Sequence, residues 1–166
     1  MKKIIIALIA VLSVAVNVNA QKFGHIDTQS IMQSLPEVTK ANGELQATAQ
    51  QYDNELKAMQ DEIQRKADEY DKQKATMNAT QQQAAEQDLQ TLYNKLQQAY
   101  QQNQQELQKK QEELMDPIRK KIKTAIENVG KAGNYTYIIE ATTPLYIGAS
   151  STDVTAAVKA EINKIK

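Results

Sequence analysis

The chain has 166 residues, and its 20 basic and 20 acidic side chains give a formal net charge of zero. This balance argues against a strongly basic nucleic-acid binder, so no nucleic-acid partner is predicted. The absence of Cys excludes disulfides, cysteine nucleophiles and thiolate metal sites, and a single His excludes a multi-His metal site. Five Gly, three Pro and eight aromatic residues beside 22 Gln suit long solvated helices better than a compact globule.

The first twenty residues have the layout of a secretory signal peptide. Lys2 and Lys3 precede an apolar run over residues 4–16, and small residues at 18–20 offer a cleavage site before Gln21. As a helix, such a run reaches only about 20 Å, which is short of the roughly 30 Å hydrocarbon core of a membrane. We therefore expect cleavage after residue 20. The mature chain would carry 18 basic and 20 acidic groups, a formal charge of −2.

Two apolar stripes with steps of three and four predict two long amphipathic helices in the middle of the chain. Residues 34–37 precede the first stripe and have the pattern of a capping box from Ser34 to Glu37, with Pro36 in the first turn. Gly130 and Gly133 follow the second stripe as stop signals. The first stripe contains Leu45, Ala49, Tyr52, Leu56, Met59, Ile63, Ala67, Tyr70 and Met77, and the second contains Ala85, Leu89, Leu92, Leu96, Tyr100, Leu107, Leu114, Ile118, Ile122, Ala125 and Val129.

The short connection between the stripes favours antiparallel packing of the two helices, as a hairpin arm over residues 37–130. With a tip near residues 78–82, the numbers of opposed residues sum to about 159, which places Tyr70 opposite Leu89. From Leu107 onward several apolar residues recur at intervals of eleven, a period that keeps a straighter stripe.

Gly43 and Pro117 are predicted to form a hinge near the base of this hairpin. Pro117 lacks an amide donor and strains the preceding turn, and its register partner Asn42 adjoins Gly43. The alternative is that Asp116 and Pro117 simply restart a helix with a local cap.

The two ends of the chain, residues 21–36 and 131–166, are predicted to form one β-rich body. Strands are expected at 22–27, at 135–140 and from Leu145 to Ile147. Such a small sheet cannot bury both of its faces within one chain, and an open strand edge favours pairing with other copies.

Two short helices complete the predicted body. One covers residues 28–35, and the other begins around Thr152 and Asp153 with Val154, Val158, Ile162 and Ile165 on one face. His25 and Asp27 share a strand face, but two ligands do not make a metal site, so His25 is expected to have a structural role.

This order of elements resembles the Skp/OmpH family of periplasmic chaperones. The most specific parts are the opening strand from Phe23 to Asp27 and the closing segment from Tyr135 to Thr155, and the likeness covers residues 22–166. The resemblance implies an α+β fold: a long antiparallel α-helical coiled-coil hairpin, or tentacle, that projects from a small β body completed by trimerisation. The residues expected in the trimer body are Phe23, Ile26, Tyr137, Ile139 and Tyr146.

The resemblance also implies an ATP-independent periplasmic holdase that binds unfolded outer-membrane β-barrel proteins in a cavity between helical arms. No enzymatic activity is predicted, and no catalytic residue, cofactor or metal. Client contacts are expected at Ala75, Met77 and Ala79, because Met suits adaptable apolar surfaces; the alternative for Met77 is to close the hairpin core. The competing interpretation is a structural coiled-coil spacer or adaptor of the cell envelope.

The charge pattern departs from that family, whose best-known members are strongly basic. Residues 42–80 carry eight acidic and five basic groups, and basic residues gather instead at 119–123. Lipopolysaccharide binding is therefore not expected to carry over, and contact with a membrane is left open.

Overall fold

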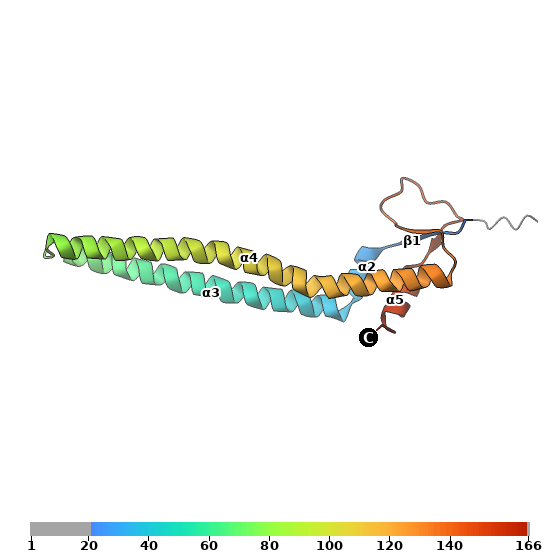
Figure 1. The fold of residues 1–166 in the computed structure, drawn as a ribbon, viewed down its shortest axis with the longest axis horizontal. Coiled ribbons are helices and arrows are strands. Elements are labelled where there is room, and N and C mark those ends of the chain that lie inside the picture. The colour runs from blue at the N-terminus through green and yellow to red at the C-terminus, as the bar shows by residue number, and fades with distance from the viewer. Residues whose placement is uncertain (1–20, 166) are drawn as a thin grey trace, which may run out of the picture. The chain divides into compact units, whose positions relative to one another are not determined.

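A computed structural model describes residues 21–165 (Figure 1). They cluster into two compact units. We call residues 29–122 the helical unit, and the chain up to Thr28 together with the chain from Lys123 onward the terminal unit. The sequence analysis placed these boundaries at residues 36 and 130. The predicted signal peptide lies outside the described residues.

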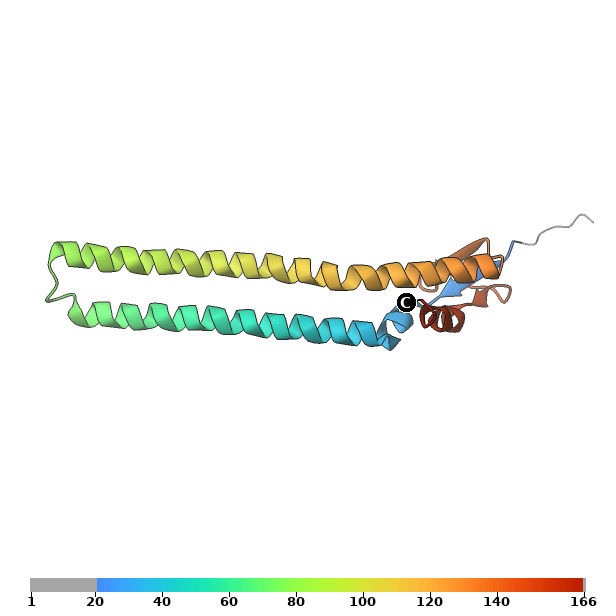
Figure 2. The same ribbon diagram turned by 60° about the horizontal axis from the view of Figure 1, so that its bottom comes forward.

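The helical unit contains two long helices that lie side by side and run in opposite directions (Figures 1 and 2). They are α3 (Pro36–Gln73) and α4 (Ala79–Ala132), of which the last ten residues cluster with the terminal unit. The short α2 (Thr28–Ser34) precedes them. The connection covers residues 74–78, so the predicted tip at 78–82 is wrong by about four residues, one helical turn. Residues 79–82 instead form the first turn of α4, because Asn78 caps that helix.

Hydrogen bonds and ion pairs join α3 to α4 along the helical unit. They pair Lys66 with Asp88, Tyr70 with Glu86 (2.6 Å), Lys110 with Glu44 (4.0 Å) and Lys121 with Glu37 (2.9 Å). The residue numbers of these pairs sum to 154, 156, 154 and 158. The antiparallel register is therefore displaced from the predicted sum of about 159, in keeping with the earlier tip.

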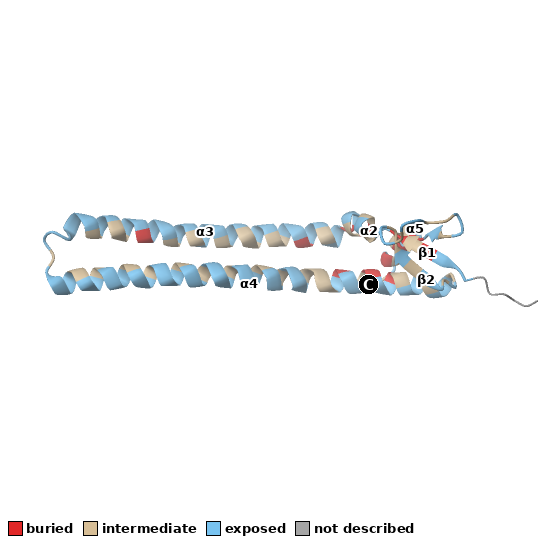
Figure 3. Cartoon of the chain, turned by 90° about the horizontal axis from the view of Figure 1, so that it is seen from above, coloured by how far each residue is buried: buried red, intermediate tan, exposed pale blue. Residues whose placement is uncertain are grey.

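The seam between α3 and α4 is only thinly buried (Figure 3). Two helices cover only one stripe of each other, so most apolar seam positions, such as Leu56 and Leu96, remain half-buried. The buried hydrophobic residues of the helical unit are Ile31, Leu35, Ala41, Ile63, Ile118 and Ile122. The helix pair consequently keeps much apolar surface within reach of solvent.

The capping box predicted at Ser34 to Glu37 does not form. Leu35 occupies the N-cap of α3 and makes no side-chain cap hydrogen bond, while Ser34 donates its hydroxyl to the Ile31 carbonyl at 2.8 Å. The helix starts one residue later than the box requires because Pro36, with its fixed φ and missing N–H, takes the first helical position. Glu37 is thereby free to pair with Lys121.

The terminal unit contains a three-stranded sheet whose central strand is the first in the chain. The strands are β1 (Phe23–Ile26), β2 (Tyr137–Glu140) and β3 (Thr152–Asp153) in the order β2-β1-β3, and both neighbours run parallel to β1. The strand predicted at Leu145 to Ile147 is wrong. A strand there would have to pair with β2 as a tight hairpin, whereas the chain crosses to the far side of β1 to form β3.

The last helix, α5 (Thr155–Ile162), packs as its sequence predicts. Val154, Val158 and Ile162 are buried, as is Ala125 of α4. The helix begins later than expected because Thr152 and Asp153 belong to β3. At the end of α4, Asn134 adopts a left-handed conformation (φ 51°) and the Tyr135 amide donates to the Gly130 carbonyl, which turns the chain into β2.

Candidate functional site

One face of the small sheet exposes apolar side chains. Side chains alternate along a strand, so Phe23 shares a face with Tyr137 and Ile139 in the β1–β2 register. The Phe23 and Tyr137 rings stack with centroids 6.2 Å apart, and all three residues are exposed. Ile26 points to the opposite face and is only 2% exposed, so it belongs to the core of its own chain.

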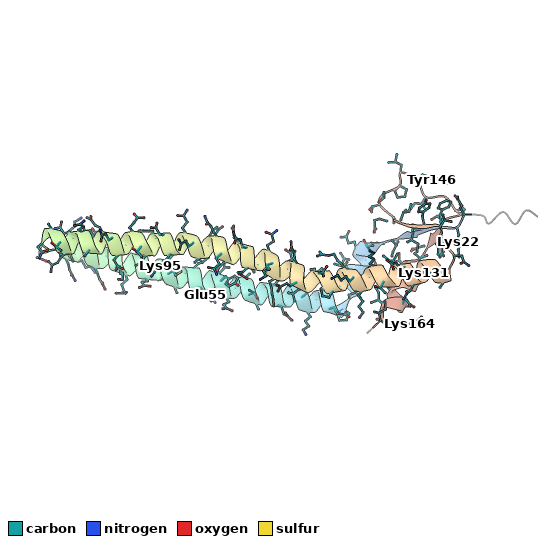
Figure 4. The ribbon with its side chains drawn as sticks, viewed as in Figure 1. Lys22, Glu55, Lys95, Lys131, Tyr146 and Lys164 are labelled. Carbon is teal, nitrogen blue, oxygen red and sulfur yellow. The ribbon has the colours of Figure 1, made fainter. Side chains whose placement is uncertain are left out.

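The loop between β2 and β3 adds two more exposed apolar residues, Leu145 and Tyr146. Figure 4 labels Tyr146 in this loop. We call Phe23, Tyr137, Ile139, Leu145 and Tyr146 the exposed apolar set. Four of the five residues predicted for the trimer body are thus solvent-accessible within one chain. The fifth, Ile26, has almost no exposed surface with which to contact another chain. Leu145 was not among the predicted residues.

Polar contacts fasten β3 and the start of α5 to β1. His25 Nδ1 lies 2.9 Å from the Ser151 hydroxyl, and the Asp27 amide donates to Thr155 Oγ1 at 3.0 Å. The Asp153 carboxylate accepts the Thr155 amide at 2.8 Å, and its bonds to the Thr155 hydroxyl and amide lower the pKa of Asp153. These bonds connect the sheet to the helix. Among the described residues, no group of three or more His, Asp or Glu side chains is placed to hold a metal ion.

The three predicted client contacts at the tip differ in their exposure. Ala75 and Ala79 are exposed, whereas Met77 is half-buried. Met77 lines a small cavity of about 140 Å³ together with Tyr70 and Leu89, which lie on opposite helices. This position of Met77 fits the alternative stated for it, which is to close the hairpin core.

Gly43 and Pro117 lie at the same level of the helix pair but do not share a cavity wall. Pro117 lines a groove of about 350 Å³ with Ala41, whereas the side of Gly43 faces open space. The charged residues around this groove include Glu37 and Lys121, and the hydrogen bond between them lowers the pKa of Glu37. α4 continues through Pro117 without a break.

A further groove, which the sequence analysis missed, lies midway along the helical unit. It has a volume of about 420 Å³. Two tyrosines of α4, Tyr93 and Tyr100, stand at it with 53% and 54% of their surface exposed. The remaining lining residues are Leu56, Gln60, Leu96 and Gln97. Two features of the sequence could have indicated this groove. The tyrosines are seven residues apart, and the segment 89–105 around them has only one charged residue, Lys95.

Together, a small parallel sheet with an exposed apolar face and a long helix pair define an α+β class of protein. The chain belongs to the OmpH-like family: the model of the family described as "Outer membrane protein (OmpH-like)" matches residues 22–162. The match confirms the family that the resemblance indicated.

Solved structures share this fold. Six of their chains match, and one is a candidate outer membrane chaperone (OmpH-like) from Caulobacter crescentus CB15. It superposes with a TM-score of 0.76 at 18% sequence identity, over 87% of this chain and 85% of that chain. No curated protein sequence matches the chain. Within residues 21–165, no helix is both long and apolar enough to cross a membrane.

Proposed function

We propose that this protein is an ATP-independent periplasmic holdase chaperone, which binds unfolded outer-membrane β-barrel proteins in a cavity between helical arms and prevents their aggregation. The observation that carries the proposal is membership of the OmpH-like family over residues 22–162. The Caulobacter protein of the same fold is itself described as a candidate outer membrane chaperone, which supports the assignment.

The helix pair is physically suited to hold unfolded clients. A holdase without a nucleotide must bind many sequences through several weak contacts, whose combined effect rests on a high effective concentration. The half-buried seam of α3 and α4 supplies apolar surface along its length, and the intervening Gln side chains keep that surface soluble.

Trimerisation is part of the proposal, and the exposed apolar set supports it. A solvated Leu145 and two solvated tyrosines gain free energy when another copy removes them from water, by roughly 25 cal/mol for each Å² of apolar area buried. β2 is an edge strand of the sheet within the described chain, so it offers free backbone groups to such a copy.

A periplasmic location would follow from cleavage of the predicted signal peptide. Mass spectrometry of the protein purified from a periplasmic fraction is expected to give an N-terminus at Gln21. Recovery of the chain in the cytoplasm with Lys2 and Lys3 still attached would contradict this part of the proposal.

The test of function is suppression of aggregation. A urea-denatured outer-membrane barrel protein is diluted into buffer without ATP, with or without this protein, and light scattering is followed. We expect scattering to fall as the chaperone approaches one trimer per client, and the bound client to remain unfolded by circular dichroism. Unchanged scattering would reject the holdase and leave the envelope spacer or adaptor as the better interpretation.

A further inference from the structure

The groove between Tyr93 and Tyr100 differs in charge from the other cavities between α3 and α4. All six of its lining residues are uncharged. The groove at Pro117 includes four charged residues, and the cavity at Met77 includes three. A ligand in the Tyr93/Tyr100 groove therefore meets apolar carbon and neutral polar groups only.

The polar groups of this groove have no partner among the described residues. The two tyrosine hydroxyls and the side-chain amides of Gln60 and Gln97 make no hydrogen bond to another described residue. Elsewhere on the two helices, some Gln amides bond to residues one turn away, as in Gln51 with Glu55 (2.8 Å) and Gln64 with Asp68 (2.8 Å). The groove thus presents neutral donors and acceptors that are free to bind a ligand.

These features select the chemistry of the occupant. A charged side chain would lose hydration beside neutral groups that cannot compensate it, so charged segments are disfavoured. A peptide backbone carries neutral N–H and C=O groups that carboxamides and phenols can satisfy in any sequence. Apolar side chains can pack on Leu56, Leu96 and the exposed tyrosine rings.

We propose that the Tyr93/Tyr100 groove binds extended, uncharged segments of an unfolded chain, of the kind that become transmembrane β-strands. Such strands are about ten residues long, alternate apolar with polar side chains, and are flanked by aromatic residues. The proposal rests on the chaperone function above and places a principal client contact at mid-helix rather than at the tip. Because no ion pair takes part, binding at the groove does not depend on salt.

Two lysine substitutions test the groove with a matched control. Gln97 lines the groove, whereas the neighbouring Gln98 is exposed and lies outside it. Gln97→Lys puts a charge into the neutral groove, and Gln98→Lys adds the same charge about 100° around the same helix. Affinity is measured by fluorescence anisotropy with a labelled, urea-denatured barrel protein. We expect Gln97→Lys to weaken binding about five-fold or more and Gln98→Lys to leave it unchanged.

A double substitution of the tyrosines gives an independent arm. Tyr93→Ala with Tyr100→Ala is expected to weaken binding about ten-fold, while the helical circular dichroism signal is retained. If this variant fails to fold, the comparison of Gln97→Lys with Gln98→Lys still tests whether the groove binds the client. For the unsubstituted protein, the affinity is expected to change by less than about two-fold between roughly 50 and 500 mM NaCl.

The outcomes separate the groove from the general function. If the unsubstituted protein does not bind the client, the holdase itself is rejected. If it binds but both lysine variants bind equally well, the groove is rejected and the holdase stands. A photo-crosslinking residue at position 93 should form adducts with the client. If it instead links one copy of this chain to another, with or without client, a second copy fills the groove and the proposal is overturned.

Discussion

Asp153 shows how one carboxylate joins the sheet to α5. It is the last residue of β3, pairs with His25 in the sheet register, and accepts hydrogen bonds from Thr155 at the start of the helix. These bonds are stronger when the carboxylate is ionised, which is why the pKa of Asp153 is lowered in the folded protein.

The first prediction concerns the pH dependence of this contact. A lowered folded-state pKa adds stability above the unfolded value of 3.8, and that stability is lost as the pH falls through the folded value. Asp153→Asn should therefore lower the free energy of unfolding at pH 6 by roughly 0.5 kcal/mol or less, because the carboxylate is exposed, and by progressively less toward pH 3. Urea unfolding of both proteins across this range measures the difference. A penalty that stays constant with pH would show that the charge is not the cause.

At the turn between α3 and α4, Asn78 and Gln81 form the capping box that was wrongly assigned to Ser34 and Glu37. The Asn78 side chain accepts the Gln81 amide at 2.9 Å, and the Gln81 side chain accepts the Asn78 amide at 3.0 Å. The Gln82 amide group also donates to the Lys74 and Met77 carbonyls. Three neutral side chains thus fasten the turn between the helices.

The second prediction follows from this box. Asn78→Ala removes the acceptor at the start of α4 and should lower the free energy of unfolding by about 0.5–2 kcal/mol. Thr80→Ala, an exposed change in the same turn, is the control and should have little effect. Thermal unfolding followed by circular dichroism compares the two. Equal destabilisation by both changes would contradict a capping role.

Residue-scale detail was hard to predict because two segments of the chain offered the same kind of signal. Ser34 with Glu37 and Asn78 with Gln81 both have the spacing of a capping box. The two pairs differ only because Pro36 sets where α3 begins. The helix therefore starts one residue too late for Ser34 to be its N-cap. The groove tyrosines were missed because Tyr100 was assigned to the seam, and the spacing of seven between Tyr93 and Tyr100 is also that of a seam heptad.

At the scale of elements, α3 and α4 do not keep one register along their length. From the Glu44–Lys110 pair to the Glu37–Lys121 pair, α3 advances by seven residues and α4 by eleven. Pro117 lies within this stretch of α4, where the apolar residues also recur every eleven positions. The change in apolar period that was visible in the sequence therefore coincides with a real change in pairing.

The third prediction tests the proposed hinge at this place. The side of Gly43 meets no atom within 4 Å, so Gly43→Ala should stabilise the protein by about 0.5–1 kcal/mol, since Ala favours the helix. Pro117→Ala restores an amide donor in α4 and should raise the free energy of unfolding by up to about 3 kcal/mol. With both changes, small-angle scattering should report a narrower range of particle dimensions. An unchanged range together with unchanged capacity for large clients would remove the hinge.

The order and type of the long elements were predictable, and the small sheet was only partly so. The periodicity of the two stripes extends over many residues, whereas β3 has two residues and no apolar side chain of its own. Leu145 to Ile147 resembled a strand because apolar residues that lie in a loop and apolar residues that lie in a strand look alike in sequence. Tyr137 and Ile139 were correctly placed in a strand, because their segment has the regular alternation of one.

At the scale of the whole molecule, the exposed apolar set makes stability depend on the proposed assembly. Subunits that fold and associate together are stabilised by mass action, so the melting temperature should rise with protein concentration. This dependence would distinguish an oligomer from an isolated chain that happens to expose Leu145 and Tyr146.

The fourth prediction uses Leu145, which is fully exposed within one chain. Leu145→Glu costs an isolated chain little but would bury a charge in an interface, so it should convert trimers to monomers at micromolar concentration. Thr142→Glu, in the same loop, is the matched control. Native mass spectrometry and analytical ultracentrifugation give the mass. A trimer that persists in the Leu145→Glu protein would exclude the loop from the interface.

The central position of β1 has a consequence for the order in which the protein folds. β1 is made first, yet its parallel partners β2 and β3 lie more than a hundred residues later in the chain. Closing so long a loop is slow, whereas the five-residue turn lets α3 and α4 pair locally as they emerge. During synthesis, the first strand therefore stays unpaired until almost the whole chain has been made. During that interval, this protein is itself an unfolded chain of the kind that it is proposed to bind.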